Sequence, residues 1–279
     1  MNRRTFIVST GILSGVFAFS NLFAKKKSMT FHFLRHATFI LEVNNIRILV
    51  DPMLGAKDSM DPVKITRNNF RIPMINLPLT EEQLTRELKT IDAVIVTHTH
   101  RDHWDEKSRQ LLPKNIDIIG QSTDQETLTT QGFTNLHLID SSIEFKGLKI
   151  TRTGGQHGTG EIGKRMGNVS GFVIEFNNQK IYIAGDTIWC PEVEQALATH
   201  RPDFTVLNAG AARFDQGDPI TMTAEDVMKV SEKLSSTKVI AVHMETVNHC
   251  DLKRDEIKKI LSGKGIRALI PVDGEKISL

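Results

Sequence analysis

The sequence lacks the features that mark several large classes of protein. Its formal net charge is only +2 over 279 residues, so no strong basic field points to nucleic acid as a partner. It has two cysteines, Cys190 and Cys250, with no C-x-x-C pair and no zinc-finger spacing. They would either form one disulfide in an oxidising compartment or remain two separate buried thiols. No repeat or Pro/Gly-rich linker divides residues 28–279, which we therefore interpret as one domain.

The first 27 residues differ from the rest because they are basic and contain no acidic residue. Arg3 and Arg4 precede a largely apolar stretch, residues 6–24, and three lysines follow it. This order predicts a signal peptide over residues 1–27, and residues 2–7 resemble a twin-arginine motif. We therefore expect recognition by the export machinery and a periplasmic location. The alternative is an uncleaved membrane anchor, because the apolar part approaches the roughly 20 residues that span a bilayer.

Short runs rich in valine and isoleucine predict strands along the rest of the chain. Paired asparagines at 44–45 and 177–178 predict tight hairpin turns between neighbouring runs. Early hairpins followed by strand–helix alternation predict a layered α/β protein with sheets inside and helices outside. The expected strands are residues 39–43, 46–50, 93–97, 116–119, 148–151, 172–176, 180–184, 204–207, 239–242 and 268–271.

Three helix starts are predicted from residues that cap or open helices. Each precedes a run of apolar residues at helical spacing, and the cap supplies acceptors for the first free N–H groups. The residues are Thr80 with Gln83, Thr223 with Asp226, and the first-turn proline Pro191.

A dense cluster of metal-binding residue types directly follows one predicted strand. His98, His100, Asp102 and His103 lie within six residues. Imidazole and carboxylate groups together suit Zn²⁺, Mn²⁺ or Fe²⁺, whereas a solvated polar loop is the alternative. A catalytic zinc takes about three protein ligands and keeps one open position, so further ligands must come from elsewhere in the chain.

Four other residues have suitable chemistry and position. His157 lies in a segment with four glycines, residues 154–160, which indicates that the backbone passes close to another group. Asp51, Asp186 and His243 each follow an apolar strand-like run. Asp186 would serve either as a bridging ligand or as an ordinary turn residue. Side chains placed at strand ends are expected to meet at one edge of a sheet.

This ordered set resembles the metallo-β-lactamase superfamily across nearly all of residues 29–275. Residues 35–39 (RHATF) make it particularly similar to the branch containing ascorbate-phosphate lactonases and N-acyl phosphatidylethanolamine phospholipase D-like hydrolases. The resemblance implies a four-layer αββα sandwich. It also implies one metal at His98, His100 and His157, a second at Asp102, His103 and His243, Asp186 bridging them, and Asp51 orienting the ligands.

The resemblance further implies a hydrolase in which a hydroxide bridging two divalent ions attacks an ester, lactone or phosphodiester bond. We expect Zn²⁺, with Mn²⁺ or Fe²⁺ as alternatives, and a small or lipid-like substrate. Asp102 is the expected catalytic carboxylate. His36 is a candidate for contact with the substrate or the ligands, and His249 is a candidate proton donor to the leaving group.

Two alternatives and one loop remain open at this stage. A related iron-dependent redox enzyme, either di-iron or a mono-iron dioxygenase, would use the same fold, but the di-iron motif is expected to carry an acid where this chain has His100. A metal-binding module without catalysis is the other alternative. The segment between Asp51 and Thr80 is expected either to form an apolar lid or to pack on the body; its apolar residues are Met53, Leu54, Met60, Phe70, Ile72 and Met74.

The export prediction is tested by replacing the paired arginines. Arg3→Lys combined with Arg4→Lys keeps the charge but should hold the precursor in the cytoplasm, because the twin-arginine pathway, which moves folded cargo, reads the arginines themselves. Cell fractionation measures the distribution, and Lys26→Arg with Lys27→Arg serves as the charge-matched control. Unchanged export of the first variant would contradict the prediction.

Overall fold

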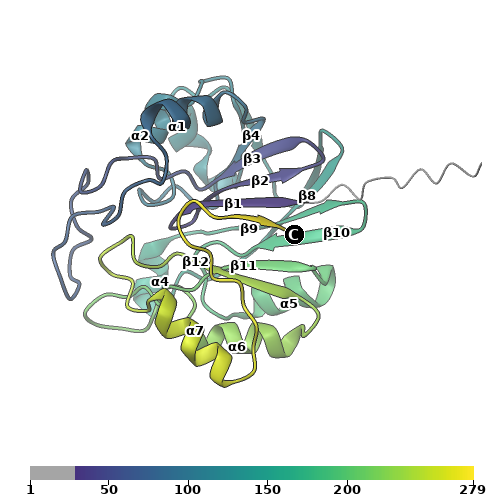
Figure 1. Ribbon diagram of the computed structural model, residues 1–279. Helices are drawn as coiled ribbons and strands as arrows, with labels where there is room; N and C mark the ends of the chain where they lie inside the picture. Colours follow the sequence, from purple (N-terminus) through teal and green to yellow (C-terminus); the bar gives the residue numbers. More distant parts are fainter. Residues whose placement is uncertain (1–28) are drawn as a thin grey trace, which may run out of the picture.

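The computed structural model describes residues 29–279, so the predicted signal peptide lies outside the described residues. Within residues 29–279, no helix is long and apolar enough to cross a membrane. This part of the chain forms two facing β-sheets with helices on their outer sides (Figure 1). The predicted four-layer αββα architecture is therefore confirmed.

The first sheet comes mainly from the N-terminal half and the second from the C-terminal half. In the first sheet the strand order is β13-β1-β2-β3-β4-β5-β6, and in the second it is β12-β11-β10-β9-β8-β7. The strands of the first sheet are β1 (Thr30–Arg35), β2 (Thr38–Val43), β3 (Ile46–Val50), β4 (Ala93–Ile95), β5 (Asp117–Gly120), β6 (Asn135–Leu138) and β13 (Lys276–Ser278). Those of the second are β7 (Ser142–Phe145), β8 (Leu148–Thr153), β9 (Gly171–Phe176), β10 (Gln179–Ile183), β11 (Phe204–Asn208) and β12 (Lys238–Val242).

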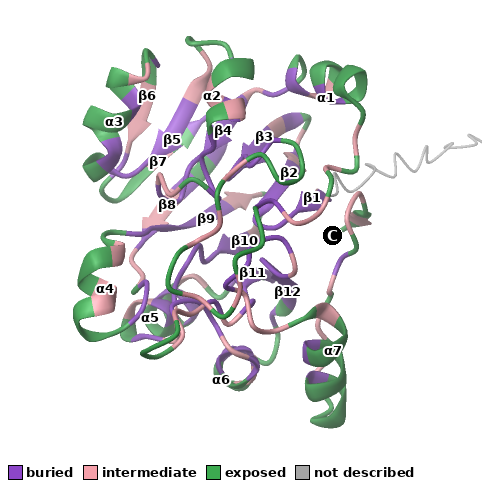
Figure 2. Ribbon diagram, turned by 90° about the vertical axis from the view of Figure 1, so that its left-hand side faces the viewer, coloured by how far each residue is buried: buried purple, intermediate pink, exposed green. Residues whose placement is uncertain are grey.

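Three apolar cores hold the four layers together. The central core lies between the sheets and includes Phe31, Phe172 and Ile240. The outer two cores place helices against the far face of each sheet, so the strands are buried while the helices stay exposed on their outer sides (Figure 2). The helices are α1 (Glu81–Leu88), α2 (Glu106–Leu111), α3 (Gln125–Thr130), α4 (Gly160–Met166), α5 (Pro191–His200), α6 (Ala224–Lys233) and α7 (Arg254–Gly263).

Parallel pairing brings the ends of several strands to one edge of the sandwich. β3 runs parallel to β4, and β10, β11 and β12 run parallel to one another. Since parallel strands end on the same side, the loops after them converge. Asp51 directly follows β3 and His243 directly follows β12, as the sequence indicates.

Most of the predicted elements are present. The capping boxes of Thr80 and Thr223 and the first-turn position of Pro191 are confirmed. The expected strand at 268–271 is wrong: there Leu269 forms a single bridge to Ile240, and a proline two residues later has no N–H to continue a ladder. The sequence did not reveal strands β1, β6, β7 and β13.

The two cysteines, both within the described residues, are unpaired. Cys190 is buried in the core outside the second sheet and its sulfur lies 3.4 Å from Thr187 Oγ1. Cys250 lies instead beside His243, with its sulfur 3.5 Å from Nδ1 of that ring. Of the two arrangements expected from the sequence, the structure has the separate thiols.

The long segment between β3 and α1 is held in place by one buried arginine. The Arg35 guanidinium donates to Met53 O (2.8 Å), Gly55 O (2.5 Å) and Ile75 O (3.0 Å), and thereby ties both ends of the segment to β1. Burial lowers the pKa of Arg35 only to about 10, so the side chain stays charged at neutral pH. The irregular backbone thus gains fixed partners for carbonyls that would otherwise be buried without a donor.

The apolar residues of this segment mainly pack onto the body rather than cover the edge of the sheets. Met53 and Ile72 are buried against Val247, and Met60, Val63 and Met74 pack around them. The side chain of Asn248 fastens the outer part through bonds to Val63 N, Val63 O, Thr66 Oγ1 and Asn68 O. Phe70, in contrast, is 65% exposed. The segment is a fixed wall, and the packed alternative fits it better than a lid.

Replacing the buried arginine should destabilise the protein strongly. Arg35→Met keeps the length of the side chain but leaves three carbonyls without a donor, and we expect the free energy of unfolding to fall by about 3–5 kcal/mol. Urea unfolding followed by circular dichroism measures this change. Arg71→Met is the control, since its exposed guanidinium should contribute less than about 1 kcal/mol. An equal decrease in the free energy of unfolding in both variants would show that the buried hydrogen bonds of Arg35 do not stabilise the protein.

Candidate metal centre

The residues predicted to bind metal come together where the parallel strands end. Among residues 29–279, their donor atoms form overlapping groups in which all atoms lie within 4.8 Å of one another. The first group is His98, His100 and His157, and the second is His36, Asp102, His103 and His243; a third set, His98, His103 and Asp186, links them. All seven predicted ligands therefore belong to a single cluster, which His36 also joins.

The first group combines two loops from opposite sheets. His98 Nε2 lies 2.9 Å from His100 Nδ1, on the loop after β4. His157 comes from the loop after β8 and donates Nδ1–H to Ile220 O (2.8 Å), which turns its Nε2 toward the cluster. The adjacent Gly158 has φ +100° and lies so close to Ile220 that a Cβ would come within 2.8 Å of its side chain. The close approach expected from the glycine-rich segment is thus present.

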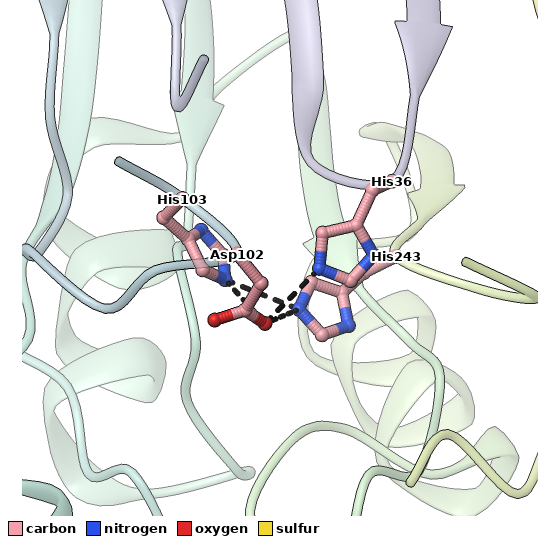
Figure 3. A group of neighbouring side chains, drawn as sticks. All are labelled: His36, Asp102, His103 and His243. Atoms are coloured by element: carbon pink, nitrogen blue, oxygen red, sulfur yellow. Dashed lines mark hydrogen bonds and ion pairs between the residues drawn. The ribbon is translucent and has the colours of Figure 1, made fainter. Parts of the chain in front are cut away.

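The second group surrounds one carboxylate oxygen (Figure 3). Asp102 Oδ2 lies 3.7 Å from His103 Nε2 and 3.8 Å from His243 Nε2. The same oxygen lies 3.2 Å from Nε2 of His36, which stands in the turn between β1 and β2. Three imidazoles from three distant parts of the chain therefore face one carboxylate.

Asp186 lies between the two groups and contacts both. Its Oδ2 is 3.5 Å from His157 Nε2 and 3.2 Å from His103 Nε2, while its Oδ1 is 3.2 Å from His243 Nε2. Asn208, at the end of β11, donates its amide to Asp186 Oδ1 (2.7 Å) and fixes the carboxylate. Asp186 therefore joins the imidazoles of both groups, and the role of Asn208 was not predicted from the sequence.

Asp51 supports the cluster from behind. Its Oδ2 accepts from His103 Nδ1 (2.9 Å) and from Thr97 Oγ1 (2.7 Å), and its Oδ1 accepts the backbone N–H of Thr97 (2.8 Å). This leaves Nε2 of His103 facing the cluster. Thr38 in turn donates its hydroxyl to Asp51 O (2.7 Å). The position agrees with an orienting role for Asp51, and the two threonines were not identified from the sequence.

The electrostatics of the cluster fit a bound cation. Burial alone would raise the pKa of Asp102 and Asp186, but His103 and its neighbours hold both pKa values well below the usual range. Burial would lower the pKa of His103, yet Asp186, Asp102 and Asp51 together raise it well above its ordinary value. Three buried carboxylates thus surround the imidazole of His103, and a divalent cation at this place would balance their negative charge as a protonated imidazole does. Imidazole and carboxylate donors are also the ones that Zn²⁺, Mn²⁺ and Fe²⁺ take.

His249 lies beside the cluster but not in it. It is 8% exposed and its ring stacks on Phe214, with centroids 6.2 Å apart. Within residues 29–279 its Nδ1 has no hydrogen-bond partner. Burial, modulated by Asp102 and His243, lowers the pKa of His249 to about 4, so the ring is neutral at neutral pH. A buried ring nitrogen beside the cluster is therefore left without a partner among the described residues.

The chain is similar over most of its length to proteins of one superfamily. A family model described as "Beta-lactamase superfamily domain" matches residues 46–244. The UPF0173 protein YddR of Bacillus subtilis (strain 168) is 37% identical over 250 residues, which cover 87% of this chain and 96% of that protein.

Two solved structures share both the fold and about a third of the sequence. One is described as a possible metal-dependent hydrolase from Veillonella parvula DSM 2008; it is 35% identical, with a TM-score of 0.86 over 90% of this chain and 100% of that chain. The other is an isothiocyanate hydrolase from Delia radicum gut bacteria, 36% identical, with a TM-score of 0.84 and the same coverage.

Removing the charge of Asp51 should weaken metal binding without changing the fold. Asp51→Asn keeps the shape of the side chain but loses the carboxylate that orients His103, and loss of such a partner costs about 10–100-fold in metal affinity. Titration of the metal-free protein with Zn²⁺ measures the change. Asp92→Asn is the control, since Asp92 accepts the backbone N–H of Arg47 far from the cluster. Wild-type affinity in Asp51→Asn would contradict the orienting role.

Proposed function

The chain is a metal-dependent hydrolase of the beta-lactamase superfamily, and we propose that it works with two divalent ions on a small or lipid-like substrate. The observation that carries the dinuclear proposal is the position of Asp186, whose carboxylate contacts His157 of one group and His103 and His243 of the other. A single ion would not require one carboxylate to contact imidazoles of both groups.

The proposed ligand sets follow the two groups. His98, His100 and His157 would hold one ion, and Asp102, His103 and His243 would hold the other, with Asp186 shared. Zn²⁺ remains the expected ion, with Mn²⁺ and Fe²⁺ as alternatives. When bound, such ions lower the pKa of a shared water and polarise a substrate oxygen. The protein's part is to hold these donors fixed, through Asp51, Asn208 and the carbonyl of Ile220.

Two residues are proposed to act on the substrate or the attacking water directly. Asp102 is buried and faces three imidazoles, which places its carboxylate at the centre of the second group. His249, neutral at neutral pH and with an unpartnered Nδ1 among the described residues, is proposed to take up the proton released by the attacking water and to pass it to the leaving group. No serine or cysteine nucleophile is needed when a metal-activated water attacks, and the thiols of the buried Cys190 and the half-buried Cys250 both have raised pKa values, chiefly through desolvation.

We propose an ester, lactone or phosphodiester as the scissile bond, since each offers an acyl or phosphoryl centre to an attacking water. An isothiocyanate is a second candidate, because a structure 36% identical to this chain is that of an isothiocyanate hydrolase. The central carbon of that group is electrophilic like an acyl carbon, and the half-buried Phe214 beside His249 suits the apolar part of such a molecule.

The iron-dependent redox alternative has weaker support. The two solved structures named above are described as hydrolases, one of them as a possible one, and His100 stands where the di-iron motif is expected to carry an acid. The absorption spectrum of the purified protein distinguishes the two, since a di-iron enzyme is coloured and a zinc enzyme is colourless. We further propose that the protein acts in the periplasm, as residues 1–27 predict.

The proposal is tested by metal analysis combined with a substrate panel. The purified protein should hold two divalent ions per chain and should hydrolyse at least one lactone, phosphodiester or isothiocyanate. Chelation should abolish turnover, and Asp102→Ala should lower the rate by more than about a hundredfold, or about 2.7 kcal/mol. His200→Ala, at the end of α5, is the control for removal of a histidine.

Three outcomes would contradict parts of the proposal. A fully loaded wild-type protein with one ion would exclude the dinuclear centre. A rate loss of tenfold or less in Asp102→Ala, with both ions still bound, would remove Asp102 from catalysis. Chelator-insensitive turnover would exclude a metal-dependent reaction.

A further inference from the structure

We propose that His36 is a ligand of the second metal ion, which then has four protein donors besides the shared Asp186. This inference rests on the dinuclear function proposed above. It concerns the turn between β1 and β2, a part of the chain separate from the H-x-H-x-D-H motif and from the other ligand loops.

The first argument is position. His36 Nε2 lies 3.2 Å from Asp102 Oδ2, closer than His103 Nε2 at 3.7 Å and His243 Nε2 at 3.8 Å. Donors bound to one ion at about 2.0–2.2 Å lie roughly 3–4 Å apart, so all three imidazoles are at ligand spacing from this oxygen. In Figure 3 the rings of His36 and His243 lie side by side, and each has a nitrogen joined by a dashed line to the carboxylate oxygen of Asp102. By position, His36 cannot be told apart from the two expected ligands.

The second argument is the backbone. His36 has φ +56°, a left-handed conformation that costs a residue with a side chain about 1 kcal/mol and that glycine or asparagine would adopt more easily. The turn nevertheless carries a histidine that is fully buried. Its carbonyl accepts the backbone N–H of His243 (2.9 Å), and the two rings are 3.7 Å apart between centroids. A strained turn thus holds the imidazole of His36 against an expected ligand.

The outer nitrogen of His36 distinguishes it from the other donors. His103 and His157 each have Nδ1 bonded to a fixed acceptor, Asp51 and Ile220 O respectively. The Nδ1 of His36 is buried and has no partner among residues 29–279. An acceptor bonded to Nδ1 fixes the ring of a ligating histidine and makes its Nε2 a stronger donor to the metal. Since His36 lacks such an acceptor, it should bind the second ion more weakly than the other donors do. Loss of His36 should therefore weaken the binding of the second ion without abolishing it.

The extra donor makes the two positions unequal. The first ion would have three histidines and one oxygen of Asp186, while the second would have His36, Asp102, His103, His243 and the other oxygen of Asp186. Zn²⁺ prefers about four ligands in all, whereas Mn²⁺ and Fe²⁺ accept six. We infer that the second position favours an ion of higher coordination number, and that the first position is the one left open to the substrate.

Variants at position 36 separate a ligand from a hydrogen-bond partner of Asp102. His36→Asn tolerates the left-handed turn and keeps an N–H donor, but it removes the imidazole. His36→Gly relieves the left-handed turn and removes the side chain altogether, leaving a space that added imidazole can fill. His32→Asn is the matched control, because His32 is a buried histidine on β1, the strand before this turn, and its Nδ1 also lacks a partner among the described residues.

The metal-free proteins are titrated with Co²⁺, and binding isotherms and visible ligand-field absorption are recorded. We expect wild type and His32→Asn to bind two ions with the same spectrum. Both variants at position 36 should bind the first ion as wild type does and the second about tenfold more weakly. The second ion's absorption should become more intense as its coordination number falls. Added imidazole should restore the wild-type spectrum in His36→Gly.

Two results would overturn the inference. If both variants at position 36 reproduce the affinity and spectrum of wild type, His36 is not a ligand. If His36→Asn behaves as wild type while His36→Gly does not, His36 acts only as a hydrogen-bond donor to Asp102. A wild-type protein that binds a single Co²⁺ would instead refute the dinuclear function on which the inference rests, so the two failures are distinguishable.

Discussion

The arrangement of the centre depends on one carboxylate that is not itself placed as a ligand. Asp51 directly follows β3, and its two oxygens accept hydrogen bonds from the backbone N–H and hydroxyl of Thr97, just beyond the parallel strand β4, and from the ring of His103. The register of β3 against β4 therefore fixes the start of the H-x-H-x-D-H loop. The same carboxylate holds Nδ1 of His103 and so directs Nε2 of that ring toward Asp186. A small shift between these two strands would move both groups of donors at once.

The centre also joins the two halves of the sandwich. The first sheet supplies the H-x-H-x-D-H loop, and the second supplies His157, Asp186 and His243. Backbone bonds cross between them at two places near the cluster, from His243 N to His36 O (2.9 Å) and from Ser170 N to Thr97 O (3.1 Å). Neither half can form either group completely, so the chemistry requires both sheets to be packed.

Much of the site was predictable because polar residues after apolar strands must meet where parallel strands end. This rule placed Asp51, His98, Asp186 and His243 without any knowledge of the fold. It could not identify Arg35, whose buried role depends on carbonyls up to 40 residues away along the chain. Thr38, Thr97 and Asn208 likewise resemble ordinary polar residues until their partners are seen. Strands such as β6 and β13 carry exposed residues at sheet edges, so no apolar run marks them.

The backbone at the centre has a consequence for how such a protein changes over generations. Asp51, His243 and His36 all have positive φ, at 41°, 69° and 56°, in positions where glycine would be easier. Each of these backbone conformations costs the folded chain about 1 kcal/mol. We attribute their presence to the donor and orienting atoms that these side chains place at the cluster. In a duplicated copy that no longer needs the metal cluster, we expect substitutions at these three positions to accumulate early. Such a copy would keep the αββα sandwich but lose the residues of the metal cluster.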